Sequence, residues 1–214
     1  MATVPEIVAP SDLDPLARGY RLCGFDPLYA PLIAGWVGTE EQLRWLAPST
    51  PHPLTAAKVV AWKNEGRRAF VFFGGPDSTP LGYGELNPMG NHPDHWWLGH
   101  ILVRPDQRRR GIGGALVRAL LAEAFERRGA ARVSLIVFPD NLAAVHCYRR
   151  AGFREVGHEH HRFTETGPLQ KLLRLEITSP EMQTAEPSPR RGDRVGSVVP
   201  RASPTATRRA VGDA

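Results

Sequence analysis

The sequence predicts an α/β protein of the α+β type, in which a mixed, mostly antiparallel central sheet carries helices on both faces. Three apolar segments separated by turns rich in Gly, Pro and Asn are expected to form consecutive antiparallel strands: 68–73, 80–87 and 95–103. A helical pattern follows over 111–128, where apolar residues recur about every four positions. The next segment, 133–138, is an almost continuous apolar run, which is typical of a central strand covered on both faces.

The N-terminal part predicts one strand and three short helices. The strand is expected over 19–23. Asp26-Pro27 predicts a helix start, because Asp caps free amides and Pro suits the first turn. Thr39, followed three residues later by Gln, forms a capping box for a second helix, and Thr55 is expected to cap a third.

Composition divides the chain into three parts. Residues 1–14 are expected to be loose, and 179–214 are rich in Pro, Arg and Ser without Leu, Ile or aromatic residues. Such a tail buries too little apolar surface to offset the entropy of ordering, so we expect it to be disordered. Residues 15–178 are expected to form one domain, since 42% hydrophobic content can supply a core. The domain is expected to close with a helix and a hairpin: 141–150, 153–163 and 169–177.

Charge and cysteine content exclude several classes of protein. The chain has 214 residues and a net charge of +5, but its basic residues are scattered or lie in one turn and the tail, which does not favour nucleic-acid binding. No apolar run approaches the roughly 20 residues of a membrane helix, and no signal-peptide pattern is present. Cys23 and Cys147 show neither zinc-ligand spacing nor a disulfide framework, so a cytoplasmic location is expected.

The most informative stretch joins the strand that ends at Val103 to the long helix. A basic turn, Arg108–Arg110, leads into Gly111–Gly114. The first amides of a helix lack internal partners and carry partial positive charge, so this turn predicts an anion site suited to two joined phosphates. It is not a dinucleotide fingerprint, because Leu116 occupies the position of the third glycine, and no Gly-Lys-Ser/Thr closes an ATP-type loop.

A second informative stretch, Asn141–Phe153, follows the central strand. Asn141 and Tyr148 are seven residues apart, which is two helical turns, so they share one helix face. A helix-capping Asn and a core Tyr would explain the same pattern without any ligand.

Both stretches resemble motifs of the GNAT superfamily of N-acyltransferases. The pattern Arg-x-x-Gly-x-Gly at 108–113, after Val-x-Pro at 103–105, is similar to the acyl-CoA-binding motif of that family. The segment 141–153 is similar to the helix that follows the family's fifth strand. The resemblance covers roughly 20–177 and implies a GNAT fold of about six to seven strands, splayed between strands 4 and 5. It also implies an N-acetyltransferase domain over 15–178 that uses acetyl-CoA as co-substrate, with no metal.

The resemblance further implies how acetyl-CoA is held. The pantetheine arm would pair with the end of the fourth strand, the glycine turn would take the pyrophosphate, and an amide near Leu102 would polarise the thioester carbonyl. Asn141 would contact the arm, and Tyr148 would protonate the leaving thiolate. The expected cofactor-binding residues are Ile101, Leu102, Val103, Arg108, Arg109, Arg110, Gly111, Ile112, Gly113, Gly114, Ala115, Asn141 and Tyr148.

The amine acceptor must lose a proton, and the bases usual in two branches of the family are absent. Their positions on the fourth and fifth strands hold Trp97 and, approximately, Ile136, which weakens a protein-acetylating role. Glu85 is the first candidate base, followed by His100 and then His95. His100 has the opposite strand parity, which a β-bulge would reverse. A plain polar role at a strand edge stays open for each of them, with ordered water as the base.

Other chemistry-bearing residues have simpler interpretations. Cys147 points about 100° away from its neighbour Tyr148 around the helix, so we interpret it as a small core residue rather than a nucleophile. The His-rich segment 158–161 lacks a fourth ligand, so no metal site is expected. Four aromatic residues are expected either to line the acceptor side or to belong to the core: Trp36, Tyr83, Trp96 and Trp97.

The expected function is acetyl transfer from acetyl-CoA to an amine of a small molecule or peptide, by direct attack in a ternary complex. The expected catalytic residues are Tyr148, Glu85 and His100. The alternative is a catalytically silent acyl-CoA-binding or sensor module. We expect neither a nucleic-acid nor a membrane partner, and a monomer or homodimer.

Overall fold

Seven strands form a single sheet in the order β1-β2-β3-β4-β5-β7-β6. The computed structural model describes residues 19–62, 68–74, 78–90 and 92–179, and the expected loose N-terminus and disordered tail lie outside these ranges apart from Ser179. The strands are β1 (Arg21–Gly24), β2 (Arg68–Gly74), β3 (Thr79–Met89), β4 (His92–Val103), β5 (Arg132–Val137), β6 (Arg154–His161) and β7 (Gln170–Thr178). The predicted strand count and mostly antiparallel sheet are therefore confirmed.

The helices also follow the expected order. They are η3 (Pro27–Tyr29), α1 (Ala30–Ala34), α2 (Glu40–Leu46), α3 (Ala56–Ala61), η4 (Pro105–Gln107), α4 (Ile112–Ala122), η5 (Glu123–Arg127) and α5 (Leu142–Arg150). Thr39 Oγ1 accepts from Gln42 N at 3.2 Å and Thr55 Oγ1 from Lys58 N at 3.4 Å, so both predicted caps are confirmed. Among the described helices, none is both long and apolar enough to cross a membrane.

Two predicted helices are less regular than expected. The helix that begins after Asp26 starts as a 3-10 turn, because Pro31 offers no amide to a carbonyl one turn earlier, and it ends at Ala34 with Gly35 as its C-cap. The long helix over 111–128 widens into the π-helical turn η5 after Ala122 and ends at Gly129, which has φ +65°.

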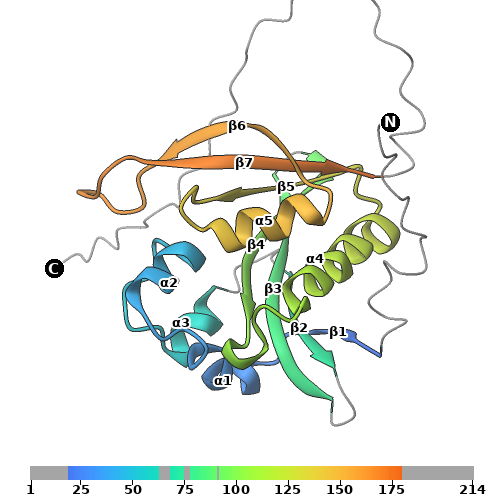
Figure 1. The fold of residues 1–214 in the computed structure, drawn as a ribbon, viewed down its shortest axis with the longest axis horizontal. Coiled ribbons are helices and arrows are strands. Elements are labelled where there is room, and N and C mark those ends of the chain that lie inside the picture. The colour runs from blue at the N-terminus through green and yellow to red at the C-terminus, as the bar shows by residue number, and fades with distance from the viewer. Residues whose placement is uncertain (1–18, 63–67, 75–77, 91, 180–214) are drawn as a thin grey trace, which may run out of the picture.

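The inner strands of the sheet are mostly buried on both faces, and successive side chains of each strand point to opposite sides. On β2, Phe70 and Phe72 belong to a core shared with α4 and α5, whereas Val71 and Phe73 belong to a second core under α1, α2 and α3. Figure 1 shows these two helix groups on different sides of the sheet.

Strands β4 and β5 are the parallel pair in the sheet, and they separate early. Their pairing covers only His95–Trp97 with Arg132–Ser134, so no described strand pairs with the β5-facing edge of β4 beyond Trp97. β5 instead continues along β7 as far as Val137. Figure 1 shows the result: β5, β7 and β6 run roughly horizontally in the view, whereas β3 and β4 run roughly vertically. The predicted splay between strands 4 and 5 is confirmed.

Candidate active site

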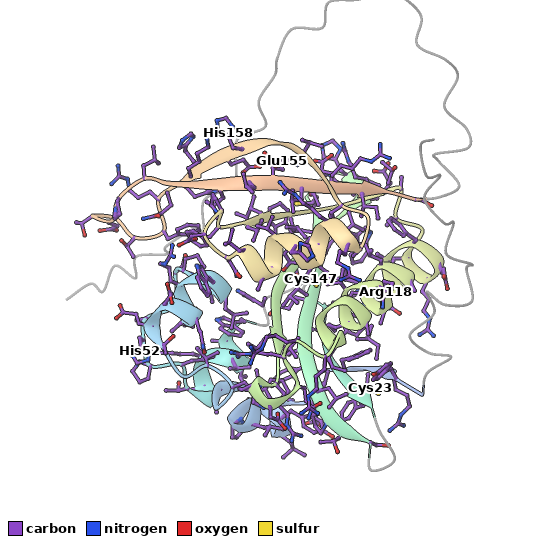
Figure 2. The ribbon with its side chains drawn as sticks, in the orientation of Figure 1. Cys23, His52, Arg118, Cys147, Glu155 and His158 are labelled. Carbon is purple, nitrogen blue, oxygen red and sulfur yellow. The ribbon has the colours of Figure 1, made fainter. Side chains whose placement is uncertain are left out.

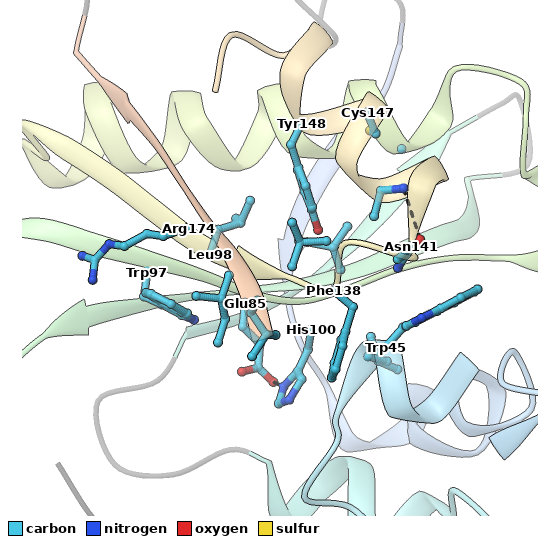
Figure 3. A pocket seen from close by; sticks show the side chains of 18 of the residues that line it. Trp45, Glu85, Trp97, Leu98, His100, Phe138, Asn141, Cys147, Tyr148 and Arg174 are labelled. Carbon is cyan, nitrogen blue, oxygen red and sulfur yellow. Dashed lines mark hydrogen bonds and ion pairs between the residues drawn. The ribbon is translucent and has the colours of Figure 1, made fainter. Parts of the chain in front are cut away.

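A cavity of about 2280 Å³ opens where β4 and β5 separate, and both motif stretches line it. Figure 3 shows Tyr148 reaching into this cavity from α5, with Glu85 and His100 on the far side of the splayed strands. The predicted residues that line it are Glu85, His95, His100, Ile101, Leu102, Val103, Arg108, Arg109, Gly111, Gly113, Gly114, Asn141 and Tyr148.

The candidate base Glu85 is fully buried on β3. The Tyr83 hydroxyl donates to Glu85 Oε1 at 2.7 Å. His100 Nδ1 lies 2.9 Å from the same oxygen, which is an ion-pair distance, although the ring is not aligned for a directed hydrogen bond. The structure thus joins two of the predicted candidates into one acid–base pair. A buried carboxylate is costly without partners, and Tyr83 and His100 supply them.

The pair forms because β4 contains a bulge. Gly84 of β3 alone stands opposite His100 and Ile101, so the register shifts by one residue between the pairs Tyr83–Leu102 and Glu85–Gly99. His100 has φ +47°, which is uncommon for a residue other than glycine. The extra residue reverses strand parity and turns His100 toward Glu85, so the predicted reversal is confirmed. The Trp62 ring stacks on the imidazole ring of His100, with ring centroids 4.4 Å apart, and so covers one face of that ring.

The glycine turn presents backbone amides to the cavity. Arg109 and Gly111 have φ +61° and +80°, a conformation that glycine adopts freely and that costs another residue about 1–2 kcal/mol. Within the described part of the chain, no backbone carbonyl accepts from the amides of 109–114. The Ala115 amide donates to Gly111 O at 3.1 Å, so it belongs to the helix and is not a free donor, contrary to its predicted role.

The arginines of this turn have different positions. Arg108 donates from Nε to Val103 O at 3.1 Å and from its terminal amino group to Trp36 O at 2.9 Å, so its side chain joins the end of β4 to the segment after α1. Burial lowers the pKa of Arg108. Arg110 is exposed, and Ile112 is buried in the core. Neither side chain lines the cavity, so a binding role for these two rests on their amides.

Helix α5 supplies Asn141 and Tyr148. Asn141 Oδ1 accepts from Ala144 N at 3.2 Å, so this residue caps the helix as well as lining the cavity. Tyr148 is half-buried and packs edge-on against Phe153 at 5.9 Å between centroids. Burial raises the pKa of Tyr148, with the neighbouring Cys147 adding to the shift, so the hydroxyl is protonated at neutral pH.

Cys147 lies at the contact between α5 and α4. A Cβ placed on Gly113 would be 3.4 Å from Cys147 Sγ. Figure 2 shows Arg118 of α4 beside this cysteine. Burial raises the pKa of the Cys147 thiol, and Arg118 offsets only part of the shift. The thiolate is the nucleophilic form, so these surroundings favour a packing role for Cys147.

His95 belongs to a different cluster. Its Nε2 lies 2.7 Å from Ser134 Oγ, and its side chain is buried. Burial, followed by the charge of Arg132, lowers the pKa of His95. His95 lies five positions before His100 and outside the Glu85 contact, so the structure does not bring this third candidate to the acid–base pair.

The structure also gives the positions of the His-rich segment and of the four aromatic candidates. The His158 and His160 rings meet edge-on at 5.5 Å on the outer strand β6, where Figure 2 shows His158. In the ranges that the structure describes, no group of three or more His, Cys, Asp or Glu residues could hold a metal ion. Of the four aromatic candidates, Trp97 lines the cavity, and the other three are buried in the cores: Trp36, Tyr83 and Trp96.

Sequence reasoning missed two neighbours of the acid–base pair. Tyr83 and Glu85 are two apart on one strand, so the alternation of side chains could have placed them together. Trp62 comes from the end of α3, and nothing local in the sequence connects it to His100.

Comparison with known families matches this geometry. The profile of the acetyltransferase (GNAT) family matches residues 39–153, a range that contains the bulged strand, the glycine turn and Tyr148. That range is more than half of the chain. The chain belongs to the acetyltransferase (GNAT) family.

Curated acetyltransferases from other organisms match part of this chain. Mycothiol acetyltransferase from Rhodococcus jostii is 30% identical over 156 residues, which cover 71% of this chain and 49% of that protein. Aminoglycoside N(6′)-acetyltransferase type 1 from Klebsiella pneumoniae is 30% identical over 91 residues, covering 38% of this chain and 45% of that protein. The chain thus spans about half the length of the curated relatives that it matches.

A solved structure supports the GNAT fold. The spermidine N-acetyltransferase from Vibrio cholerae, in complex with CoA and spermine, superposes with a TM-score of 0.62 at 19% sequence identity. The match covers 74% of this chain and 95% of that one. At this identity the likeness concerns the fold, and the acceptor has to be inferred from the cavity itself.

Proposed function

We propose that this protein transfers an acetyl group from acetyl-CoA to an amine by direct attack in a ternary complex. One observation carries the proposal: a protonated tyrosine, Tyr148, and a buried acid–base pair, Glu85–His100, face the same cavity from the two sides of an open strand edge. The acceptor is an amine of a small molecule or peptide.

The chain's own groups suit acetyl-CoA. In the part of the chain that the structure describes, no strand pairs with the β5-facing edge of β4 beyond Trp97. This edge can therefore pair with the amide-containing pantetheine arm as an added strand would. The amides of 109–114 are available to a pyrophosphate at the start of α4, where the helix dipole favours anions. Arg109 lines the same region and adds positive charge. When bound, acetyl-CoA supplies the activated thioester.

Tyr148 serves the leaving group. A thiolate needs a proton as the thioester bond breaks, and a buried hydroxyl with a raised pKa holds one at neutral pH. The thiolate at the end of the pantetheine arm would lie between α5 and the open strands. This is the space that Figure 3 shows in front of Tyr148.

Glu85 and His100 serve the acceptor. An ammonium has no lone pair, so the amine must lose a proton before or during attack. His100 contacts Glu85 through Nδ1 and lines the cavity, so the pair can take this proton directly or through one water. Tyr83 holds the carboxylate in place from the other direction.

The two cysteines agree with a cytoplasmic location. Cys23 is exposed, Cys147 is half-buried, and both are free. Free thiols persist in reducing compartments.

Two-substrate kinetics test this function. Initial rates of CoA thiol release are measured while the concentrations of acetyl-CoA and of an amine are both varied. The mass of the product is determined by mass spectrometry. Direct attack predicts intersecting reciprocal plots and an amine heavier by one acetyl group. Parallel plots would contradict it, because they indicate an acyl-enzyme. Tight acetyl-CoA binding without turnover of any amine would favour the silent acyl-CoA-binding module instead.

A further inference from the structure

The cavity that holds the acid–base pair is rich in positive charge. Among the described residues that line it, six are arginines and two are glutamates. Both glutamates are already engaged: Glu85 by Tyr83 and His100, and Glu159 by Arg174 at 2.7 Å and His161 at 2.6 Å. A second ammonium group on the acceptor would therefore meet no carboxylate that is still available in this lining.

Large apolar side chains border the same space. Trp97, on β4, Trp45, on α2, and Phe163, after β6, line the cavity and are each only half-buried. The Trp45 indole N–H donates to Asp140 Oδ1 at 3.2 Å, which fixes the orientation of its ring. Half-exposed aromatic faces gathered at one cavity indicate a binding surface for a flat apolar group.

Trp97 lies next to Gly99, the residue opposite Glu85. A Cβ placed on Gly99 would lie 3.7 Å from Trp97 Cδ1 and 3.8 Å from Nε1, so the indole extends along β4 over Gly99. Gly99 is the residue that pairs with Glu85. Because Trp97 and Gly99 are two apart on β4, the indole projects from the same face of the sheet as Glu85. A side chain at position 99 would separate these groups, and glycine leaves the space between them open.

Asn87 adds a polar group at this point. It pairs with Trp97 across the strands and lines the cavity. Its Oδ1 is buried and accepts no hydrogen bond from the described residues. The amide nitrogen Nδ2, rather than this oxygen, faces the space at Gly99, 3.6 Å from where a Cβ on Gly99 would lie.

We propose that the acceptor is a monoamine with an aromatic body, such as an arylalkylamine, whose amine lies at Glu85–His100 and whose ring stacks on Trp97. This inference rests on the proposed function and adds the class of acceptor. A polyamine or aminoglycoside needs several carboxylates, which this cavity does not offer, and a purely aliphatic amine leaves the indole face uncovered.

An amine panel tests the acceptor class. The panel contains 2-phenylethylamine, tryptamine, butylamine, spermidine, kanamycin and a short peptide, each assayed for thiol release from acetyl-CoA. We expect kcat/KM for the two aromatic amines to exceed that for butylamine and spermidine at least tenfold. Equal or faster turnover of any non-aromatic member would overturn this inference and leave the acetyltransferase function standing. No turnover of the whole panel would overturn both.

Substitutions locate the ring-binding surface. Trp97→Ala should raise KM for 2-phenylethylamine at least tenfold and leave KM for acetyl-CoA and for butylamine unchanged, and Trp97→Phe should restore most of the affinity. Tyr29→Ala removes an aromatic ring of similar exposure outside the cavity and should change neither constant. The stabilisation of each variant by acetyl-CoA in a thermal melt checks that it is folded. An unchanged KM for 2-phenylethylamine in a folded Trp97→Ala protein would overturn the assignment.

Discussion

At the scale of single residues, Tyr148 is assigned to the leaving group. Its hydroxyl faces the cavity, and burial keeps its proton in place, so removing the hydroxyl should slow breakdown of the thioester. We expect Tyr148→Phe to lower kcat roughly 10²- to 10⁴-fold while the dissociation constant for acetyl-CoA changes little. Tyr29→Phe, outside the cavity, is the control for loss of a hydroxyl. A Tyr148→Phe enzyme with the kcat of the parent would show that water or another group protonates the thiolate.

Glu85 is assigned to the acceptor amine. Glu85→Gln keeps the shape of the side chain and an oxygen for Tyr83 but loses the ability to take a proton. We expect a fall in kcat of roughly 10²- to 10⁴-fold with acetyl-CoA binding retained. Glu155→Gln makes the same exchange at an exposed residue paired with Arg149, and its steady-state rates should match those of the parent. Full activity of Glu85→Gln would leave ordered water as the base.

His95 makes the fold sensitive to acid. Burial lowers the pKa of this residue in the folded state below the ordinary value of about 6.5 that applies to the unfolded chain. Between these two pKa values the unfolded chain binds more protons, so this contribution to stability is complete above about pH 6.5 and is lost as pH falls through the folded value. The melting temperature should therefore drop more between pH 7.5 and pH 5 in the parent than in His95→Asn. Equal drops in thermal melts would contradict this assignment.

At the scale of elements, the turn into α4 and the contact between α4 and α5 shape the co-substrate site. A side chain at Gly113 would start 3.4 Å from Cys147 Sγ and 3.6 Å from Val103 Cγ2, which places its bulk between α5 and the end of β4. We expect Gly113→Trp to lose the stabilisation by acetyl-CoA in thermal melts. Gly24→Trp is the matched control, because a Cβ there meets nothing within 4 Å. A folded Gly113→Trp protein with the stabilisation of the parent would remove the glycine turn from the site.

At the scale of the whole molecule, the sequence predicted features that depend on neighbouring residues better than features that depend on contacts between distant elements. The glycine turn and the Asn141–Tyr148 face follow from neighbours in sequence, and the structure places both at one cavity. The acid–base pair depends on the register between β3 and β4, and the bulge at His100 changes that register by one residue. Trp62, which stacks on His100, comes from another element and leaves no local signal. The position of β7 between β5 and β6 likewise depends on tertiary packing, and the alternation of polar and apolar residues along the strands does not predict it.

The central claim is that the cavity between β4 and β5 binds acetyl-CoA, and a thermal melt tests it most directly. The protein is melted alone and with acetyl-CoA, NAD or ATP. A ligand at 100 times its dissociation constant adds about 2.7 kcal/mol to the stability of the folded state. We predict a clear rise in melting temperature with acetyl-CoA and none with NAD or ATP. A rise with NAD or ATP in place of acetyl-CoA, or no rise with any ligand, would contradict the claim.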